Sequence, residues 1–263
     1  LGDVYKRQVY QLIRGAFYPS FGKPHDGLGF APALMEHAHG STAICGIVYY
    51  DDRLWPTSFK DNVFIGNVMT SRLNRDILIA RGSSKKAIEQ PDLLSSRDPW
   101  FRPVDIQLGP DGSLYIADFY NRIIGHYEVP LDHPGRDRHR GRIWKLTYRG
   151  APGHLSQGHG LMDLTTASME EVVEQLGHPN ITRRMLATQF LADEKGIAAG
   201  ASLVERWDNK SLPNWQQRAH GLWVMHRTQV LVQSMLEDAL NDVSMEVRVH
   251  ALLVLSEQHH PDE

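Results

Sequence analysis

Two short segments with the same residue pattern lie about fifty residues apart, and this spacing constrains the fold more than any other feature of the chain. Residues 63–67 read VFIGN and residues 114–118 read LYIAD: apolar, aromatic, Ile, small, Asn or Asp. The offset from 63 to 114 is 51 residues. A period of about fifty with several strands per repeat is typical of a β-propeller blade, whereas a solenoid strand unit is about half as long. The pattern predicts that residues 9–150 form antiparallel blades.

The clearest strand pattern lies between residues 101 and 148. Apolar and polar side chains alternate over residues 104–108, and extended structure resumes at residue 114 after a turn. Pro110 presets φ for this turn, and Gly112 can adopt the positive φ that other residues resist. A propeller closes with at least about four blades, and this part of the chain supplies about two or three. We therefore expect an internal fragment of a longer protein.

The first eight residues are interpreted as an artefact of sequence assembly. Residues 3–8 read DVYKRQ, the translation of a transposase end sequence used in preparing sequencing libraries. The chain also begins without Met, so we expect that its own start is lost, together with any export signal. An ordinary first strand is the alternative interpretation.

Beyond residue 150 the spacing of apolar residues changes from two towards 3.6, which is typical of helices. Residues 151–165 are predicted to form a linker and residues 166–263 a helical domain. Three segments share the pattern Arg-x-x-(Ala/Gly)-x-x-x-(Leu/Met), starting at Arg184, Arg218 and Arg248, at offsets of 34 and 30 residues. They resemble short HEAT-type repeats, which stack because no single helix hairpin buries its own apolar face. An irregular helical bundle is the alternative.

Composition excludes several classes of protein. The formal net charge of −3 provides no basic surface for nucleic acid, so we expect no nucleic-acid partner. No apolar stretch reaches the length of a membrane helix, so no membrane segment is expected in this fragment. The single cysteine, Cys45, lies in the apolar run STAICGIVYY and is predicted to be a small buried residue. One cysteine also excludes a CxxCH haem motif from this chain.

The runs HGSTAICGIVYY and RPVDIQLGPDGSLYIADFYNRIIGHYEVPLDHPGRDRHRGRIW, followed by the helical repeats, resemble a known family. It is the planctomycete-type family of membrane-bound dehydrogenases, and the resemblance covers most of residues 35–255. That family has a propeller similar to glucose/sorbosone dehydrogenases, then HEAT repeats, and often a cytochrome c segment. The resemblance implies an exported protein, periplasmic or at the cell surface. It would oxidise a sugar or alcohol with pyrroloquinoline quinone and calcium, and pass electrons to a haem outside this fragment.

The resemblance also implies cofactor contacts. Arg102, in Arg-Pro-Val-Asp, matches an Arg-x-x-Asp element whose arginine faces the cofactor, and Asp105 completes the element. Asn121, Arg122 and His39 are the further candidates for cofactor binding. A structural ion pair between Arg102 and Asp105 is the alternative. No catalytic residue is assigned, because the catalytic histidine of the sugar dehydrogenases lies in an early blade.

Three other groups have two interpretations each. Asp118 and Asn121 follow a strand and are candidate calcium ligands, although Asx residues at strand ends commonly form local turns. His37 and His39 are candidates to contact substrate or metal, or to form a hydrogen-bonded loop pair, since no third ligand is apparent. The charged loop 132–141 would either hold an anion or pin the propeller to the helical domain through salt bridges, which we favour.

Two other functions are compatible with these patterns. A non-catalytic propeller would bind glycans or protein, while the repeats recruit a partner on their concave face. That partner would be another protein or the protein's own downstream cytochrome segment. A calcium-dependent hydrolase of the lactonase kind would need converging carboxylates, which the sequence does not display.

Overall fold

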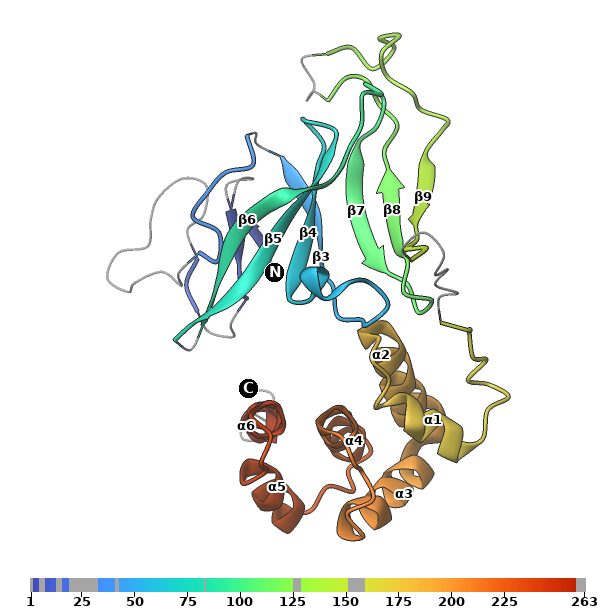
Figure 1. The fold of residues 1–263 in the computed structure, drawn as a ribbon. Coiled ribbons are helices and arrows are strands. Elements are labelled where there is room, and N and C mark those ends of the chain that lie inside the picture. The colour runs from blue at the N-terminus through green and yellow to red at the C-terminus, as the bar shows by residue number, and fades with distance from the viewer. Residues whose placement is uncertain are drawn as a thin grey trace. The chain divides into compact units, whose positions relative to one another are not determined.

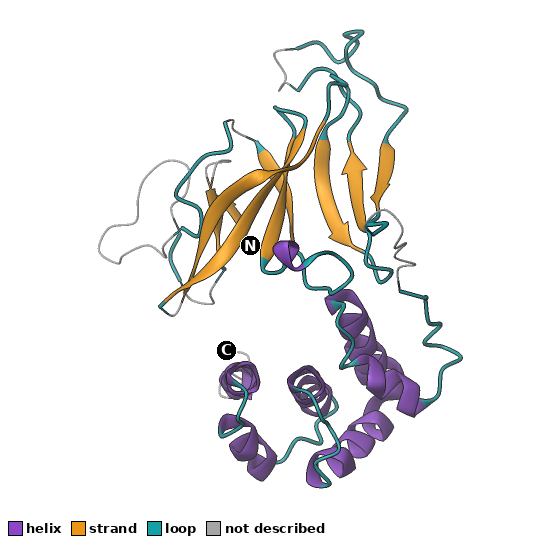
Figure 2. Ribbon diagram, viewed as in Figure 1, coloured by secondary structure: helices purple, strands orange, loops and turns teal. Residues whose placement is uncertain are grey.

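The computed structural model describes residues 2–4, 8–12, 16–18, 33–40, 43–82, 84–124, 129–150 and 159–258. The chain divides into two compact units, residues 1–159 and 160–263. The first unit consists of antiparallel sheets, and the second consists of helices (Figures 1 and 2). The predicted linker 151–165 includes the point of division, and its residues 151–158 lie outside the described part of the chain.

The described residues of the first unit form three antiparallel sheets. A two-stranded sheet pairs β1 (Gly2–Val4) with β2 (Gln8–Tyr10), so β1 includes residues of the segment interpreted as an artefact. A four-stranded sheet has the order β3 (Ile44–Tyr49), β4 (Asn62–Asn67), β5 (Arg72–Arg81) and β6 (Ser84–Ser95). A three-stranded sheet has the order β7 (Pro103–Leu108), β8 (Leu114–Asp118) and β9 (Arg142–Leu146). In the two larger sheets each strand pairs with the next one along the chain. A short 3₁₀ helix, η1 (Thr57–Phe59), connects β3 to β4.

The two segments with the same residue pattern occupy equivalent places. Residues 63–67 lie in β4 and residues 114–118 form β8, and each strand is the second of its sheet. Every residue of β4 is buried, as expected for an apolar strand that is covered on both faces. The period of about fifty residues therefore corresponds to one sheet.

The four-stranded and three-stranded sheets pack together through their first strands, β3 and β7 (Figure 1). Glycines allow this approach. Gly46 has φ +59°, and a Cβ there would collide with the backbone of Asp105. A Cβ at Gly66 would collide with the carbonyl of Pro103, to which Cys45 Sγ also donates at 3.6 Å. Cys45 is partly exposed, so the prediction that it is fully buried is wrong.

The turn between β7 and β8 confirms the prediction from its sequence. Gly112 has φ +81°, and its N–H donates to the carbonyl of Gly109 at 3.0 Å. The Gly109 N–H donates to the Ser113 carbonyl at 2.8 Å, which closes the hairpin. Lys145 on β9 pairs with Asp111 in the same turn at 2.6 Å.

Segment 33–40 packs on one face of the four-stranded sheet. Leu34 and Met35 are buried in a core with Ile44, Val63 and Ile65 of β3 and β4. The Ala87 N–H of β6 also donates to the Leu34 carbonyl at 2.7 Å. The segment is thus held by side-chain burial and by a backbone hydrogen bond, and it carries His37 and His39 onto the sheet.

In the second unit, residues 160–258 form six α-helices around an apolar core. They are α1 (Met169–Gln175), α2 (Ile181–Gln189), α3 (Gly196–Asp208), α4 (Trp215–Arg227), α5 (Gln233–Leu240) and α6 (Met245–Gln258), with a π-helical segment η2 (Phe190–Lys195) between α2 and α3. A capping box begins α1, because Ser168 Oγ accepts from the Glu171 N–H and the Glu171 carboxylate accepts from the Ser168 N–H. None of the helices among the described residues is long and apolar enough to cross a membrane.

The repeated arginines of this unit make the same contact three times. Each donates from Nη1 to the two carbonyls that lie six and five residues earlier in the chain. Arg184 bonds to His178 and Pro179, Arg218 to Leu212 and Pro213, and Arg248 to Asp242 and Val243. Each arginine therefore fastens the loop that leads into its own helix, so the repeated sequence pattern reflects a repeated local structure.

Candidate functional site

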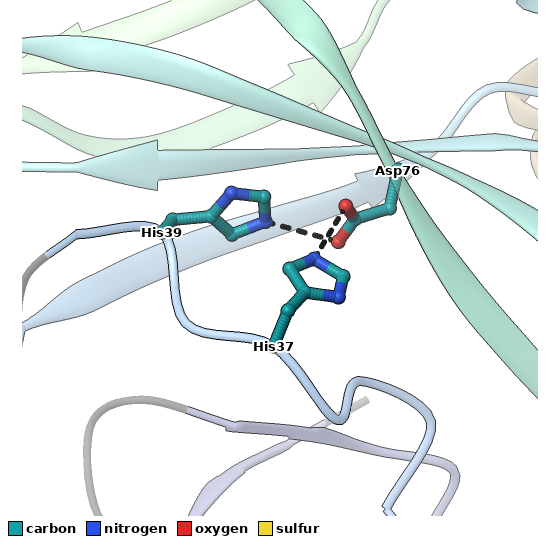
Figure 3. A group of neighbouring side chains, drawn as sticks. All are labelled: His37, His39 and Asp76. Atoms are coloured by element: carbon teal, nitrogen blue, oxygen red, sulfur yellow. Dashed lines mark hydrogen bonds and ion pairs between the residues drawn. The ribbon is translucent and has the colours of Figure 1, made fainter.

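A buried cluster of two histidines and an aspartate lies between segment 33–40 and strand β5 (Figure 3). Both imidazoles point towards the carboxylate of Asp76. His37 Nε2 lies 2.9 Å from Asp76 Oδ1, and His39 Nε2 lies 3.1 Å from Asp76 Oδ2. The side chains of His39 and Asp76 are fully buried, whereas that of His37 is 23% exposed. The sheet and the segment packed against it thus bring three polar side chains together at one buried position.

A second carboxylate reaches the other ring nitrogen of His39. His39 Nδ1 lies 3.2 Å from Glu89 Oε1 on β6, and the Glu89 side chain is 55% exposed. Because each ring nitrogen of His39 faces a carboxylate oxygen, hydrogen bonds on both sides require a protonated ring. Burial acts to lower the pKa of His39, but the hydrogen bonds and charges of Asp76 and Glu89 outweigh it, so the pKa is raised.

The backbone of the histidine segment is also fixed. The Asn67 side-chain amide donates to the His39 carbonyl at 3.1 Å and to Asn74 Oδ1 at 3.0 Å. Asn74 in turn donates to Asp92 Oδ1 at 2.7 Å. Next to this network is an open pocket of about 500 Å³. Its lining includes His39, Arg72, Asn74, Glu89 and Asp92, so polar groups surround the pocket on the Glu89 side of the cluster.

This cluster could hold a metal ion. His37, His39 and Asp76 each offer one ligand atom, and these atoms lie within 4.8 Å of one another. Two imidazole nitrogens and a carboxylate oxygen are common ligands of zinc and of other divalent transition metals. The sequence indicated the two histidines but not Asp76 or Glu89. A charged residue within the strand run RLNRDILI was the available signal, because Asp76 occupies a buried position there.

Arg102 lies just ahead of β7, and its guanidinium bonds to protein oxygens. Nε donates to the Asn121 carbonyl at 2.8 Å, and Nη2 donates to the Arg122 carbonyl at 2.8 Å. Nη1 donates to the Val68 carbonyl at 2.7 Å and to Ser71 Oγ at 3.1 Å. These bonds use four of the five N–H groups of the side chain. Arg102 therefore joins the β4–β5 turn to the loop that follows β8, as a structural residue would.

Asp118, at the end of β8, has both carboxylate oxygens occupied. Oδ1 accepts from the backbone N–H groups of Arg102 at 2.8 Å and Tyr120 at 2.9 Å. Oδ2 accepts from Arg142 Nε at 2.6 Å and Trp144 Nε1 at 2.9 Å. Burial acts to raise the pKa of Asp118, but these hydrogen bonds outweigh it and lower the pKa. A calcium ion would have to replace these donors, so the geometry favours the turn-forming role over the ligand role.

The remaining predicted cofactor residues lie in different environments. Asn121 is buried, and its side-chain amide donates to the Asp137 carbonyl at 3.0 Å. Arg122 contributes its carbonyl to Arg102, while its own side chain is exposed. Asp105 is exposed and accepts from Gln107 Nε2 at 3.0 Å. Within the described part of the chain, the Arg102 guanidinium bonds to carbonyls and a hydroxyl rather than to Asp105, so the alternative of an ion pair between them is not realised.

The arginines of the charged loop 132–141 bond to the loop itself and to the residues just before it. Arg136 Nη2 donates to the Val129 carbonyl at 3.1 Å, and Arg138 Nε donates to the Leu131 carbonyl at 2.9 Å. Arg140 pairs with Asp137 at 2.7 Å. These contacts hold the loop in its own shape. The favoured role of this loop, salt bridges to the helical domain, stays a prediction.

The fold and the buried polar clusters define a class: a unit of consecutive antiparallel sheets followed by a helical unit. The chain belongs to the family described as "Domain of unknown function (DUF7133)", whose model matches residues 7–150. No curated protein matches the chain. Among solved structures it is similar to one titled "Crystal structure of glucose dehydrogenase", at 23% identity and a TM-score of 0.32. That similarity covers 49% of this chain and 29% of the other, so the chain spans less than a third of its length.

Proposed function

We propose that this chain is part of an exported β-propeller protein that oxidises a sugar or alcohol with a quinone cofactor and passes the electrons to a haem outside the chain. One observation supports the propeller: the meander β3–β6 packs through its first strand against the first strand of the next sheet, β7–β9. Propeller blades are four-stranded sheets of this kind, arranged around a central channel. The reaction class follows from the family resemblance described above.

The helical unit completes this proposal. The three arginine contacts at equal places in successive repeats support an array of HEAT-like hairpins. Such arrays present a long concave surface to a partner. Under this proposal the partner is another protein or the cytochrome segment of the same protein.

Arg102 and Asp118, two of the residues assigned to the cofactor and to calcium, do not fit those roles. Arg102 keeps one N–H group after its bonds to protein, and both oxygens of Asp118 are occupied. A bidentate contact with a quinone carboxylate needs two parallel N–H groups. We infer that these residues hold the blades together, and that quinone and calcium are bound by parts of the protein outside this chain.

Dye reduction by the whole protein tests the proposed reaction. The protein that contains this chain is purified without cofactor and supplied with pyrroloquinoline quinone and Ca²⁺, and then with aldoses and primary alcohols. The proposal predicts substrate-dependent reduction of an artificial electron acceptor that stops when Ca²⁺ is removed. Absence of reduction with every substrate, from folded protein that has taken up quinone, would contradict the proposed reaction.

A non-catalytic binding protein is the second candidate. The use of Arg102 and Asp118 for internal hydrogen bonds favours it, because neither side chain is held ready for a ligand. The two candidates differ in one observable property. A binding protein retains glycan or protein ligands without taking up quinone, whereas the dehydrogenase takes up quinone before any substrate binds.

A further inference from the structure

We propose that His37, His39 and Asp76 form a binding site for a divalent transition-metal ion, with Zn²⁺ the best match to the ligands. The site attaches segment 33–40 to strand β5. The site shares none of its three ligands with the Arg102 hydrogen bonds and does not depend on the proposed oxidation reaction.

The ligand geometry is close to that of a zinc site. Zinc takes three protein ligands plus water in open sites, with Zn–N and Zn–O bonds of about 2.0–2.2 Å, so neighbouring ligand atoms lie about 3.3 Å apart. His37 Nε2 lies 2.9 Å from Asp76 Oδ1, and His39 Nε2 lies 3.1 Å from Asp76 Oδ2. The whole set lies within 4.8 Å.

The outer partner of His39 has the arrangement found around metal-binding histidines. A metal-ligating histidine commonly donates its second ring N–H to a carboxylate, which fixes the tautomer and the ring orientation. His39 presents Nε2 towards Asp76 and Nδ1 towards Glu89, 3.2 Å from Oε1. With a metal on Nε2, the Nδ1–H donates to Glu89. The Asn67 bond to the His39 carbonyl further fixes the loop.

The charge balance also favours a cation at this point. The Asp76 carboxylate is fully buried, and among the described residues its hydrogen-bond partners are the two imidazoles. A buried carboxylate needs a positive partner, which here is a protonated imidazole or a bound cation. Metal binding replaces the protons on the imidazole nitrogens, since both histidines must ligate as neutral rings. The open pocket lined by His39 and Glu89 lies beside the proposed site.

Metal titration of matched variants tests the site. His37→Gln removes a ligand whose side chain is 23% exposed, and His159→Gln removes a control histidine with a similarly exposed side chain (19%) that pairs with Asp52 at 2.7 Å. The tag-free full chain is titrated with Zn²⁺ by calorimetry, and folding of each variant is checked by circular dichroism. We expect one Zn²⁺ per chain for the wild type and for His159→Gln. His37→Gln should lower the affinity more than about 100-fold, since loss of an outer partner alone costs about 10–100-fold.

A further variant and a competition experiment also test the site. Glu89→Gln should lower the Zn²⁺ affinity about 10–100-fold while the fold stays intact. Ca²⁺ at equal concentration should not compete, because imidazole ligands favour transition metals. The proposal is overturned if the wild type takes up no stoichiometric Zn²⁺, if folded His37→Gln binds as tightly as the wild type, or if His159→Gln loses as much affinity. These outcomes leave the proposed oxidation reaction untouched, because its assay uses quinone and Ca²⁺.

Discussion

Acidification should destabilise the helical unit through one histidine, His220 on α4. Its Nε2 accepts from Arg184 Nε at 3.2 Å, and its Nδ1 lies 2.9 Å from Thr188 Oγ1. The Thr188 hydroxyl donates to the Arg184 carbonyl at 2.7 Å, so the ring proton belongs on Nδ1. Burial, followed by the charges of Arg184 and His250, lowers the pKa of His220 to about 3. A proton on Nε2 would face the guanidinium, which the buried site cannot accommodate.

The sign and magnitude follow from proton linkage. The pKa of His220 in the folded protein lies below the ordinary value of 6.5, so the unfolded chain binds the proton more tightly. The stability that neutral His220 contributes is complete above pH 6.5 and is lost as the pH falls towards 3. Each pH unit in this window costs up to about 1.4 kcal/mol, which amounts to about 2 kcal/mol between pH 7 and pH 5. His250, whose pKa burial also lowers, adds a loss of the same sign.

Urea denaturation at pH 7 and pH 5, followed by helical circular dichroism, measures this loss. His220→Gln should show a loss between the two pH values that is about 2 kcal/mol smaller than that of the wild type. His226→Gln is the matched control on the same helix, because it removes an imidazole that faces the half-exposed Glu257 rather than a buried arginine. The reasoning is refuted if His220→Gln and the wild type lose equal stability on acidification.

Three substitutions test the structural roles assigned above, each by chemical denaturation. Gly46→Ala should cost more than about 2 kcal/mol of stability, because the new Cβ meets the β7 backbone. The control Gly40→Ala, at φ +71° with open space around it, should cost about 1 kcal/mol. Equal costs would contradict the tight packing of β3 on β7. Arg102→Lys should cost about 2 kcal/mol of stability, since a lysine cannot reach the same carbonyls together. The control Arg122→Lys changes an exposed side chain and should be neutral within about 0.5 kcal/mol. A neutral Arg102→Lys would contradict the structural role of Arg102. Ser168→Ala should cost about 1 kcal/mol through loss of the capping box, and no change would mean that the first turn of α1 needs no cap.

Local patterns predicted local structure well. The repeated pattern at residues 63–67 and 114–118 identified two equivalent strands. A strand can be recognised from consecutive residues, because its side chains alternate between the two faces of the sheet. The turn at Gly112 and the cap at Ser168 were predictable for the same reason, since each depends on residues within four positions. The arginine pattern of the helical unit also corresponds to a repeated contact.

The candidate site was only half predictable. His37 and His39 lie in one short segment of the sequence. Asp76 and Glu89 come close to them because the β5–β6 register places these two residues opposite each other and the histidine segment packs against the sheet. Such long-range pairing leaves no pattern in a single sequence. Arg102 was misleading for a different reason. Most of its partners are backbone carbonyls, which carry no residue identity, so an arginine that holds two loops together looks the same in sequence as one that holds a ligand.

Quinone binding by the whole protein is the most direct test of the central proposal. The apoprotein is titrated with pyrroloquinoline quinone in Ca²⁺ and in a calcium chelator, and the bound cofactor is followed by its absorbance. The proposal predicts one quinone per protein, bound in Ca²⁺ and released by the chelator, with unchanged uptake in a folded Arg122→Lys variant. Folded apoprotein that binds no quinone at any Ca²⁺ concentration would contradict the proposal that this chain belongs to a quinone-dependent dehydrogenase.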